Sequence, residues 1–310
     1  MMSSFRDYDT AIDEFTEAIR LDPDNAFGYY LRGYVYINKK QYDEAISDYD
    51  LAIRLDPDKA AYYHNRGVAY CGKDQYDFAI MDFDEAIRLK PDYAEAYYRR
   101  GAAYYIKGQY DLAIRDFGEA IRLYPDKAAY YHSRGTAYAK KGQYDLAIKD
   151  YDEAIRLDPN DIDAYFNRGN AYTRKGQYDL AIKDCSELIR LDPNNARAWA
   201  LRGNACDKKG QYDESISDYT ESIRLDPDYA EAYNNRGYVC ISKGQYDEAI
   251  RDFNEAIRLY PDNANVYHSR GEAYYNKGQY DLAIKDVEKA LTIDPSHEES
   301  KDLLEKLKNI

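Results

Sequence analysis

Residues 94–127 read AEAYYRRGAAYYIKGQYDLAIRDFGEAIRLYPDK, and near copies of this stretch fill almost the whole chain. The prolines mark the period, because all nine fall in one register with a constant step of 34 residues, at positions 23, 57, 91, 125, 159, 193, 227, 261 and 295. A fixed period of this size is typical of solenoid proteins, in which each unit stacks on its neighbours. The sequence therefore predicts one repetitive array.

Each unit carries two amphipathic helical patterns joined by a short turn. In residues 94–127, Tyr97, Gly101 and Tyr104 fall on one face of a first helix, because residues three and four apart share a helix face. The second helix carries a matching stripe of Ala113, Ile114, Phe117, Ala120 and Ile121. The glycine leaves room for the paired helix, so the pattern predicts a closely packed helical hairpin.

Turn and capping residues mark the helix ends. Gly108 is predicted to end the first helix in the left-handed conformation, a place that Lys40 and Asp74 take in the first two units. After the proline, Asp92 is predicted to cap the next first helix, with Glu95 completing a capping box. The same box recurs at Asp228 and Glu231.

Two charged rows repeat with the same period. An arginine precedes the first-helix glycine in every unit, at positions 32, 66, 100, 134, 168, 202, 236 and 270. An aspartate recurs in every second helix, at positions 48, 82, 116, 150, 184, 218, 252 and 286. We hypothesise that the rows pair within each hairpin, with the arginine stem packing and its head group meeting the carboxylate. A structural role is favoured over ligand binding, because every unit keeps both residues.

The order of these residues resembles the tetratricopeptide repeat, with tyrosine or tryptophan, glycine, tyrosine, alanine, an aromatic residue, alanine and proline over 34 residues. The arginine row departs from the family pattern, which has leucine there, and tyrosine replaces the family's tryptophan everywhere except at Trp199. The resemblance implies an all-α fold, an alpha-alpha superhelix formed as a right-handed solenoid of antiparallel helical hairpins. It also implies a scaffold that binds other proteins.

The repeats divide the chain into three parts. Residues 1–25 match only the second half of a repeat and are expected to form a half repeat, which suggests a fragment of a longer protein. Eight full units follow, at residues 26–59, 60–93, 94–127, 128–161, 162–195, 196–229, 230–263 and 264–297. Residues 298–310 are predicted to form a capping helix, with a capping box of Ser296 and Glu299 and an apolar face of Leu303, Leu304, Leu307 and Ile310.

Charge and hydropathy argue against several function classes. The formal net charge is -14, whereas a nucleic-acid surface needs a net basic face, so basic or neutral protein partners fit better. The chain has no run of eighteen apolar residues that would predict a membrane span. Its first residues lack the basic start and apolar stretch of a secretory signal. A cytoplasmic location is therefore expected.

No catalytic, metal or cofactor site is expected. The sequence has no GxSxG, GxxxxGK[ST] or HExxH motif, and extended repeat surfaces do not gather a nucleophile, a base and an orienting group. His64, His132 and His268 occupy equivalent places on different hairpins, too dispersed for a shared metal. Three cysteines stand where other units have aromatic core residues and are predicted to be buried: Cys185, Cys206 and Cys240.

Positions that vary between units are the candidates for binding, because residues identical in every unit serve the stacking that all units share. In the third unit, Tyr98 and Tyr105 belong to such a variable stripe, turned by about 100° from the packing stripe of the first helix. The family resemblance places this stripe on the concave surface. The candidate groove residues are Phe27, Tyr30, Tyr34, His64, Asn65, Tyr98, Tyr105, His132, Phe166, Asn167, Asn170, Arg197, Asn204, Asn234, Tyr238 and His268.

An extended peptide or protein segment is the leading ligand hypothesis. Aromatic rings give contact area at small entropic cost, and asparagine amides satisfy both backbone donors and acceptors. Three alternatives stay open. The tyrosines of the stripe can instead pack between hairpins, or the protein can self-associate through its ends or hairpin faces. A basic row can also hold an acidic segment near Arg197; its members are Lys140, Arg174 and Lys208.

Overall fold

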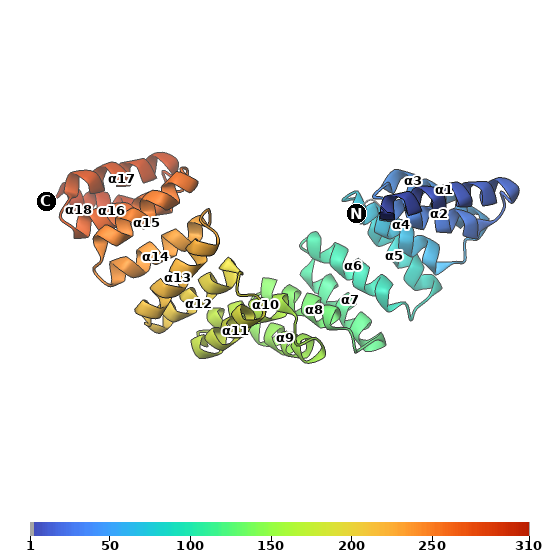
Figure 1. Ribbon diagram of the computed structural model, residues 1–310, viewed down its shortest axis with the longest axis horizontal. Helices are drawn as coiled ribbons and strands as arrows, with labels where there is room; N and C mark the ends of the chain where they lie inside the picture. The colour runs from blue at the N-terminus through green and yellow to red at the C-terminus, as the bar shows by residue number, and fades with distance from the viewer. Residues whose placement is uncertain (1–2, 310) are drawn as a thin grey trace. The chain divides into compact units, whose positions relative to one another are not determined.

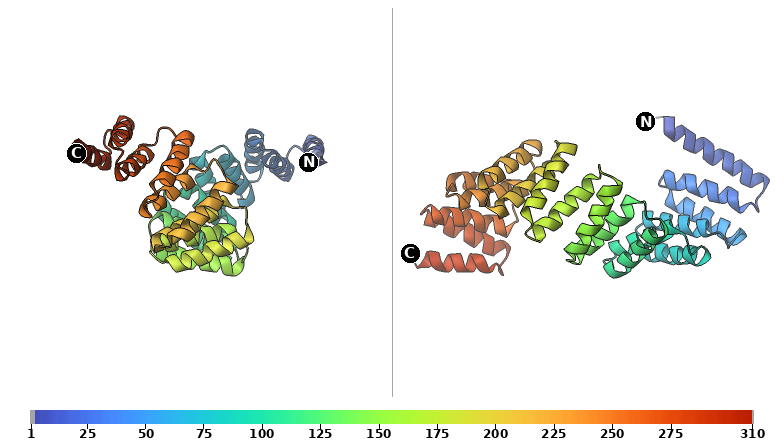
Figure 2. Two further views of the ribbon diagram at one scale, coloured as in Figure 1. Left: turned by 60° about the vertical axis from the view of Figure 1, so that its left-hand side comes forward. Right: turned by 90° about the horizontal axis from the view of Figure 1, so that it is seen from below.

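The computed structural model describes residues 3–309, and every regular element in that range is an α-helix. The chain divides into two compact units, an N-terminal unit of residues 1–159 and a C-terminal unit of residues 160–310. In both units the helices lie side by side as successive hairpins (Figures 1 and 2). The prediction of an all-α solenoid of helical hairpins is confirmed.

The N-terminal unit contains one helix followed by four hairpins. Each helix contacts the next one along the chain, and the first helices α2, α4, α6 and α8 also contact one another in sequence. The described helices of this unit are α1 (Ser3–Leu21), α2 (Ala26–Asn38), α3 (Tyr42–Leu55), α4 (Ala60–Gly72), α5 (Tyr76–Leu89), α6 (Ala94–Ile106), α7 (Tyr110–Leu123), α8 (Ala128–Lys140) and α9 (Tyr144–Leu157).

The C-terminal unit contains four hairpins followed by a single helix. Its described helices are α10 (Ile162–Arg174), α11 (Tyr178–Leu191), α12 (Ala196–Lys209), α13 (Tyr212–Leu225), α14 (Ala230–Ser242), α15 (Tyr246–Leu259), α16 (Ala264–Asn276), α17 (Tyr280–Ile293) and α18 (Glu298–Lys308). Here too the first helices α10, α12, α14 and α16 contact one another, whereas the described second helices do not. The first helices therefore form the crowded inner face of each stack.

The last helix, α18, buries Leu303 and Leu307 against α17. Ile310, the last residue of the predicted apolar face, lies outside the described residues. No helix between residues 3 and 309 is both long and apolar enough to cross a lipid bilayer.

Close helix pairing depends on the first-helix glycine wherever an aromatic ring faces it closely. A Cβ atom at Gly237 would lie 2.7 Å from Cε1 of Phe253, which is itself fully buried. The predicted close approach is therefore confirmed, since a side chain at this place would overlap the ring. The deepest face of the first helix differs from the predicted stripe, because Ala96 and Ala103 are fully buried while Tyr97 is only half-buried.

The turns between paired helices follow the sequence closely. Gly108 adopts the left-handed conformation with φ of 73°, as predicted. Lys40 and Asp74 adopt the same conformation with φ of 59° and 57°, although their Cβ atoms make it unfavourable. The connection therefore keeps one geometry even where glycine is missing.

The predicted capping boxes are wrong by one position. Helix α6 begins after Tyr93 and α14 after Tyr229, and neither residue caps its helix with a side-chain hydrogen bond. Asp92 and Asp228 lie inside the turn that follows the proline, where the carbonyl of Asp92 accepts from the Ala94 amide at 3.1 Å. The cap of α18 is likewise one residue later than the predicted Ser296, since the ring of His297 accepts from the Ser300 amide at 3.2 Å.

The Arg–Asp rows pair within every hairpin, which confirms the hypothesis. In the hairpin of α14 and α15, Arg236 donates from Nε to Oδ2 of Asp252 at 2.8 Å and from Nη2 to Oδ1 at 2.6 Å. The third nitrogen, Nη1, donates to Oγ1 of Thr220 on the preceding hairpin at 2.9 Å. Each such arginine therefore joins its own hairpin and, where an acceptor is present, the hairpin before it.

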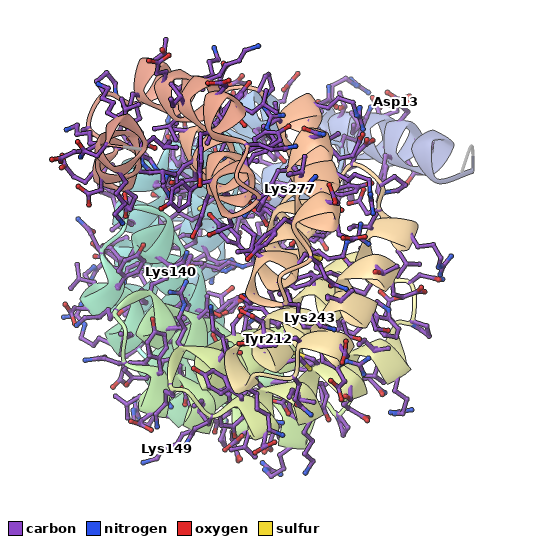
Figure 3. The ribbon with its side chains drawn as sticks, turned by 90° about the vertical axis from the view of Figure 1, so that its left-hand side faces the viewer. Asp13, Lys140, Lys149, Tyr212, Lys243 and Lys277 are labelled. Carbon is purple, nitrogen blue, oxygen red and sulfur yellow. The ribbon has the colours of Figure 1, made fainter. Side chains whose placement is uncertain are left out.

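A second ion-pair row links neighbouring hairpins at their turns. Lys243 and Lys277, labelled in Figure 3, follow α14 and α16 and pair with Asp213 and Asp247 of the preceding hairpins. These aspartates are well exposed, so each pair contributes modestly to stability. The row nevertheless fixes the register of adjacent turns.

The cysteines Cys185, Cys206 and Cys240 are buried, as predicted. Burial raises the pKa of the Cys206 and Cys240 thiols to about 11, so these groups stay protonated and act as small apolar side chains.

Candidate functional site

The N-terminal unit exposes aromatic rings at its first hairpin. Phe27 and Tyr34 on α2 are 57% and 52% exposed, and the ring of Phe27 stacks on that of Tyr30 with centroids 5.7 Å apart. The other face of Tyr30 packs toward Tyr62 of the next hairpin, at 5.1 Å. This part of the predicted stripe thus contains two exposed rings, and that of Phe27 stacks on the half-buried ring of Tyr30.

Further along the same unit, residues of the predicted stripe pack between neighbouring hairpins. His64 on α4 is only 8% exposed, with its ring centroid 4.9 Å from that of Tyr93, and burial lowers its pKa. Tyr98 on α6 lies 4.8 Å from Tyr130 and belongs to the core around Phe117. These contacts agree with the alternative in which stripe residues pack between hairpins.

The remaining candidates of this unit have local partners. The side-chain oxygen Oδ1 of Asn65 lies 3.1 Å from Nδ1 of His64. The rings of Tyr105 and Tyr110 are 5.4 Å apart, and that of His132 meets Tyr151 edge-on at 5.8 Å.

In the C-terminal unit, four candidate residues line one cavity of about 650 Å³, which we call the α10–α14 cavity. They are Phe166, Asn170, Arg197 and Asn204. The guanidinium of Arg197 lies 4.9 Å from the centre of the Phe166 ring, and the side-chain amide of Asn170 donates to the Phe166 carbonyl at 3.1 Å. The cavity is completed by Thr173, Arg174, Tyr178, Ala200, Leu201, Lys208, Tyr229, Glu231 and Asn235.

The α10–α14 cavity carries three cationic groups and one carboxylate. Arg174 and Lys208 of the predicted basic row line it together with Arg197 and Glu231. Lys208 has an ion-pair partner, Asp207, at 3.3 Å. Within the described residues neither arginine forms an ion pair, and the Arg197 head group stacks on the Phe166 ring.

A second cavity of about 410 Å³ adjoins it, and we call this one the Tyr229–Tyr260 cavity. It contains the candidate Asn234, and it shares Tyr229 and Glu231 with the α10–α14 cavity. The pKa of Tyr229 is raised, first by burial and then by the neighbouring negative charge of Glu231. The sequence-based candidates did not include Tyr229, although its position varies from unit to unit, which was the available signal.

The other candidates of the C-terminal unit lie elsewhere on the first helices. Tyr238 on α14 is 39% exposed and accepts a hydrogen bond from Ser269. His268 on α16 lies 5.1 Å from the ring of His297, and its pKa is lowered by burial and by that second ring. Asn167 on α10 already interacts with other residues of the chain. Among residues 3–309, no three His, Cys, Asp or Glu side chains gather in a group that could hold a metal ion.

Comparison with protein families matches the repeats along nearly the whole chain. Residues 33–74, 69–106, 135–176, 203–240 and 237–278 match the family described as TPR repeat. Residues 94–127, 162–195 and 264–297, and also 14–47 and 185–217, match families described as tetratricopeptide repeat. The chain belongs to the tetratricopeptide repeat family. No curated protein matches it.

Solved structures show the same fold. A tetratricopeptide repeat protein from Parabacteroides merdae is 20% identical and superposes with a TM-score of 0.64 over 81% of this chain and 99% of that one. The MamA protein is 30% identical, with a TM-score of 0.50 over 54% of this chain and 92% of that one. YrrB, a tetratricopeptide repeat protein with an unusual peptide-binding site, is 24% identical, with a TM-score of 0.50 over 60% and 96%.

Proposed function

We propose that this protein is an interaction scaffold that binds an extended segment of a partner protein in the α10–α14 cavity. Proteins of this repeat family are interaction scaffolds, generally without catalytic activity of their own. The observation that carries the finer proposal is the convergence of Phe166, Asn170, Arg197 and Asn204 on one open cavity. Its volume falls in the range of ordinary ligand pockets, about 300 to 1,000 Å³.

The chemistry of the cavity suits a peptide. The side-chain amides of Asn170 and Asn204 carry donors and acceptors, which match the alternation of N–H and C=O groups along an extended backbone. Asn170 uses one donor on the Phe166 carbonyl, and Asn204 bonds to Tyr219. Phe166 supplies a flat apolar surface that is held in place by Arg197. Such a mixture binds main chain and one apolar side chain together, and catalysis needs groups that it does not gather.

Screening a peptide library against the wild type and the Phe166→Ala/Asn204→Ala double variant tests the proposal. We expect selective peptides whose affinity falls at least about tenfold in the double variant, because an aromatic anchor and an amide pair are both removed. Phe27→Ala is the matched control, since Phe27 is exposed on the other unit. Tyr30 and Tyr98 are unsuitable targets because their rings pack against neighbouring hairpins.

Two outcomes would overturn the proposal. The first is that no peptide binds the wild type selectively. The second is that selected peptides bind the double variant as well as the wild type. Light scattering across concentration, run on the same samples, tests self-association: a monomer at every concentration counts against it.

A further inference from the structure

The Tyr229–Tyr260 cavity combines apolar, aromatic and anionic walls. Its floor is the buried side chains of Ala230, Ala256 and Val266. Its rim carries Tyr229 and Tyr260, and its other lining residues are Asp228, Glu231, Asn234 and Asn263. Tyr260 is 64% exposed at a place where most repeats have aspartate. The cavity thus offers an apolar trough that ends among carboxylates and tyrosine rings.

The chain contains an internal control for this cavity, because PDYAEAY occurs both at residues 91–97 and at 227–233. In the first copy, Glu95 pairs with Arg99 at 2.9 Å and accepts from the Tyr130 hydroxyl at 3.2 Å. The equivalents of Arg99 and Tyr130 in the second copy are Asn235 and Val266. The same carboxylate, now Glu231, therefore loses these two partners. It keeps a hydrogen bond with the Tyr229 hydroxyl, and it has no ion pair within the described residues.

The same exchange opens the space beside the carboxylate. In the first copy the rings of Tyr98 and Tyr130, 4.8 Å apart, fill this place between hairpins. Their equivalents in the second copy, Asn234 and Val266, are much smaller. One copy is therefore filled by the protein's own side chains, while the other leaves a hollow.

The first copy also places a cation on the equivalent ring. Nζ of Lys90 lies 5.1 Å from the centre of the Tyr93 ring, within the range of a cation–π contact. The equivalent of Lys90 in the second copy is Asp226, so Tyr229 has no such lysine. Two basic side chains of this unit have other contacts: Arg197 stacks on Phe166, although its charge also acts on Tyr229, and Arg258 pairs with Glu255 at 2.7 Å.

We infer that the Tyr229–Tyr260 cavity binds a lysine or arginine side chain of the partner segment. The aliphatic stem lies over the apolar floor, and the charged head meets Glu231 and the tyrosine faces. The inference rests on the proposed function for its source of ligand, because Tyr229 and Glu231 line both cavities and one extended segment reaches both. The net charge of -14 favours approach of such a basic segment.

A small probe tests the inference without any groove peptide. We would titrate N-acetyl-lysine methylamide and, in parallel, N-acetyl-norleucine methylamide, and follow the side-chain amide signals of Asn234 and Asn263 by NMR. Saturable shifts at millimolar lysine probe, absent with the uncharged norleucine probe, are expected. Equal shifts with both probes, or none with lysine, would overturn the inference while leaving peptide binding in the α10–α14 cavity untouched.

Variants then separate the two cavities. Tyr260 lines the Tyr229–Tyr260 cavity and not the α10–α14 cavity. Tyr260→Ala is therefore expected to weaken lysine-probe binding about two- to fivefold while leaving Phe166-dependent peptide binding in place. Glu231→Gln is expected to weaken it about five- to tenfold. Tyr124→Ala is the matched control, because Tyr124 holds the same turn position in the N-terminal unit and is 53% exposed. A probe affinity that both Tyr260→Ala and Glu231→Gln leave unchanged would refute the assignment.

Discussion

Arg236→Leu should destabilise the C-terminal unit strongly, although leucine is the residue that the family pattern has at this place. Asp252 is 5% exposed, and Arg236 supplies two hydrogen bonds to it, at 2.8 and 2.6 Å. Removing one partner of a buried pair costs about 3 to 5 kcal/mol, because the remaining charge stays desolvated. Since the Arg236 side chain is itself 20% exposed, we expect the lower end, about 3 kcal/mol.

The double-mutant cycle isolates the pair. Asp252→Asn alone should cost about 1 to 2 kcal/mol, since the arginine still reaches solvent. The double variant Arg236→Leu/Asp252→Asn should be less destabilised than the sum, by about 1 to 2 kcal/mol, because it buries no unpaired charge. Arg251→Leu is the control: its ion pair with Glu248 is exposed and should contribute under about 0.5 kcal/mol.

Native-state hydrogen exchange is the suitable assay, because repeat arrays lose cooperativity and global unfolding then mixes units. The loss of amide protection should concentrate in α14, α15 and the neighbouring α13, which Arg236 reaches through Thr220. A cost below about 1 kcal/mol for Arg236→Leu, or strict additivity in the cycle, would refute the idea that this row holds the hairpins together.

Four further substitutions follow from single contacts. Gly118→Asp should stabilise by about 1 kcal/mol in urea unfolding, because a Cβ there would lie 3.7 Å from Nη1 of Arg134, which makes no third hydrogen bond within the described residues. Gly237→Ala should destabilise by about 1 to 3 kcal/mol, since its Cβ would overlap the facing ring. Lys40→Gly should stabilise by about 0.5 to 1 kcal/mol by relieving the left-handed backbone, measured the same way. Burial lowers the pKa of His64, so as the pH is lowered through the ordinary histidine pKa the unfolded chain takes up a proton before the folded protein does, and the stability falls. His64→Gln removes this group and should lose less stability on acidification. Parallel profiles of stability against pH for the two proteins would contradict this.

The sequence predicted features that every unit shares, because repetition itself separates them from noise. The 34-residue proline step placed the hairpins, and the constant spacing of Arg236 from Asp252 and of its equivalents predicted the ion pairs. The capping error has a local cause: the Pro-Asp step closes a turn of its own, so the helix starts one residue later. Where that later residue is Asn or Asp, as at Asn195, its side chain does cap the helix.

It was harder to predict from the pattern which residues of the first helix are most deeply buried. Tyr97 and Tyr104 are the larger side chains, yet it is Ala96 and Ala103 that are fully buried. Small residues permit the close contact, and the tyrosines lie at its margin, where Arg100 covers the Tyr97 ring at 5.5 Å. Size alone therefore misled the assignment of the packing face.

The α10–α14 and Tyr229–Tyr260 cavities lie where smaller side chains replace some of the aromatic ones that the N-terminal unit keeps. The equivalents of Tyr98 are Ala200 and Asn234, and each lines a cavity. Variation between units is thus of two kinds: exchange among large rings preserves packing, whereas loss of a ring opens space and removes the tyrosine hydroxyl that donates to Glu95 in the aromatic copy. Only the second kind creates room for a ligand, which is why Glu231, and not its identical counterpart Glu95, is the residue to test for partner binding.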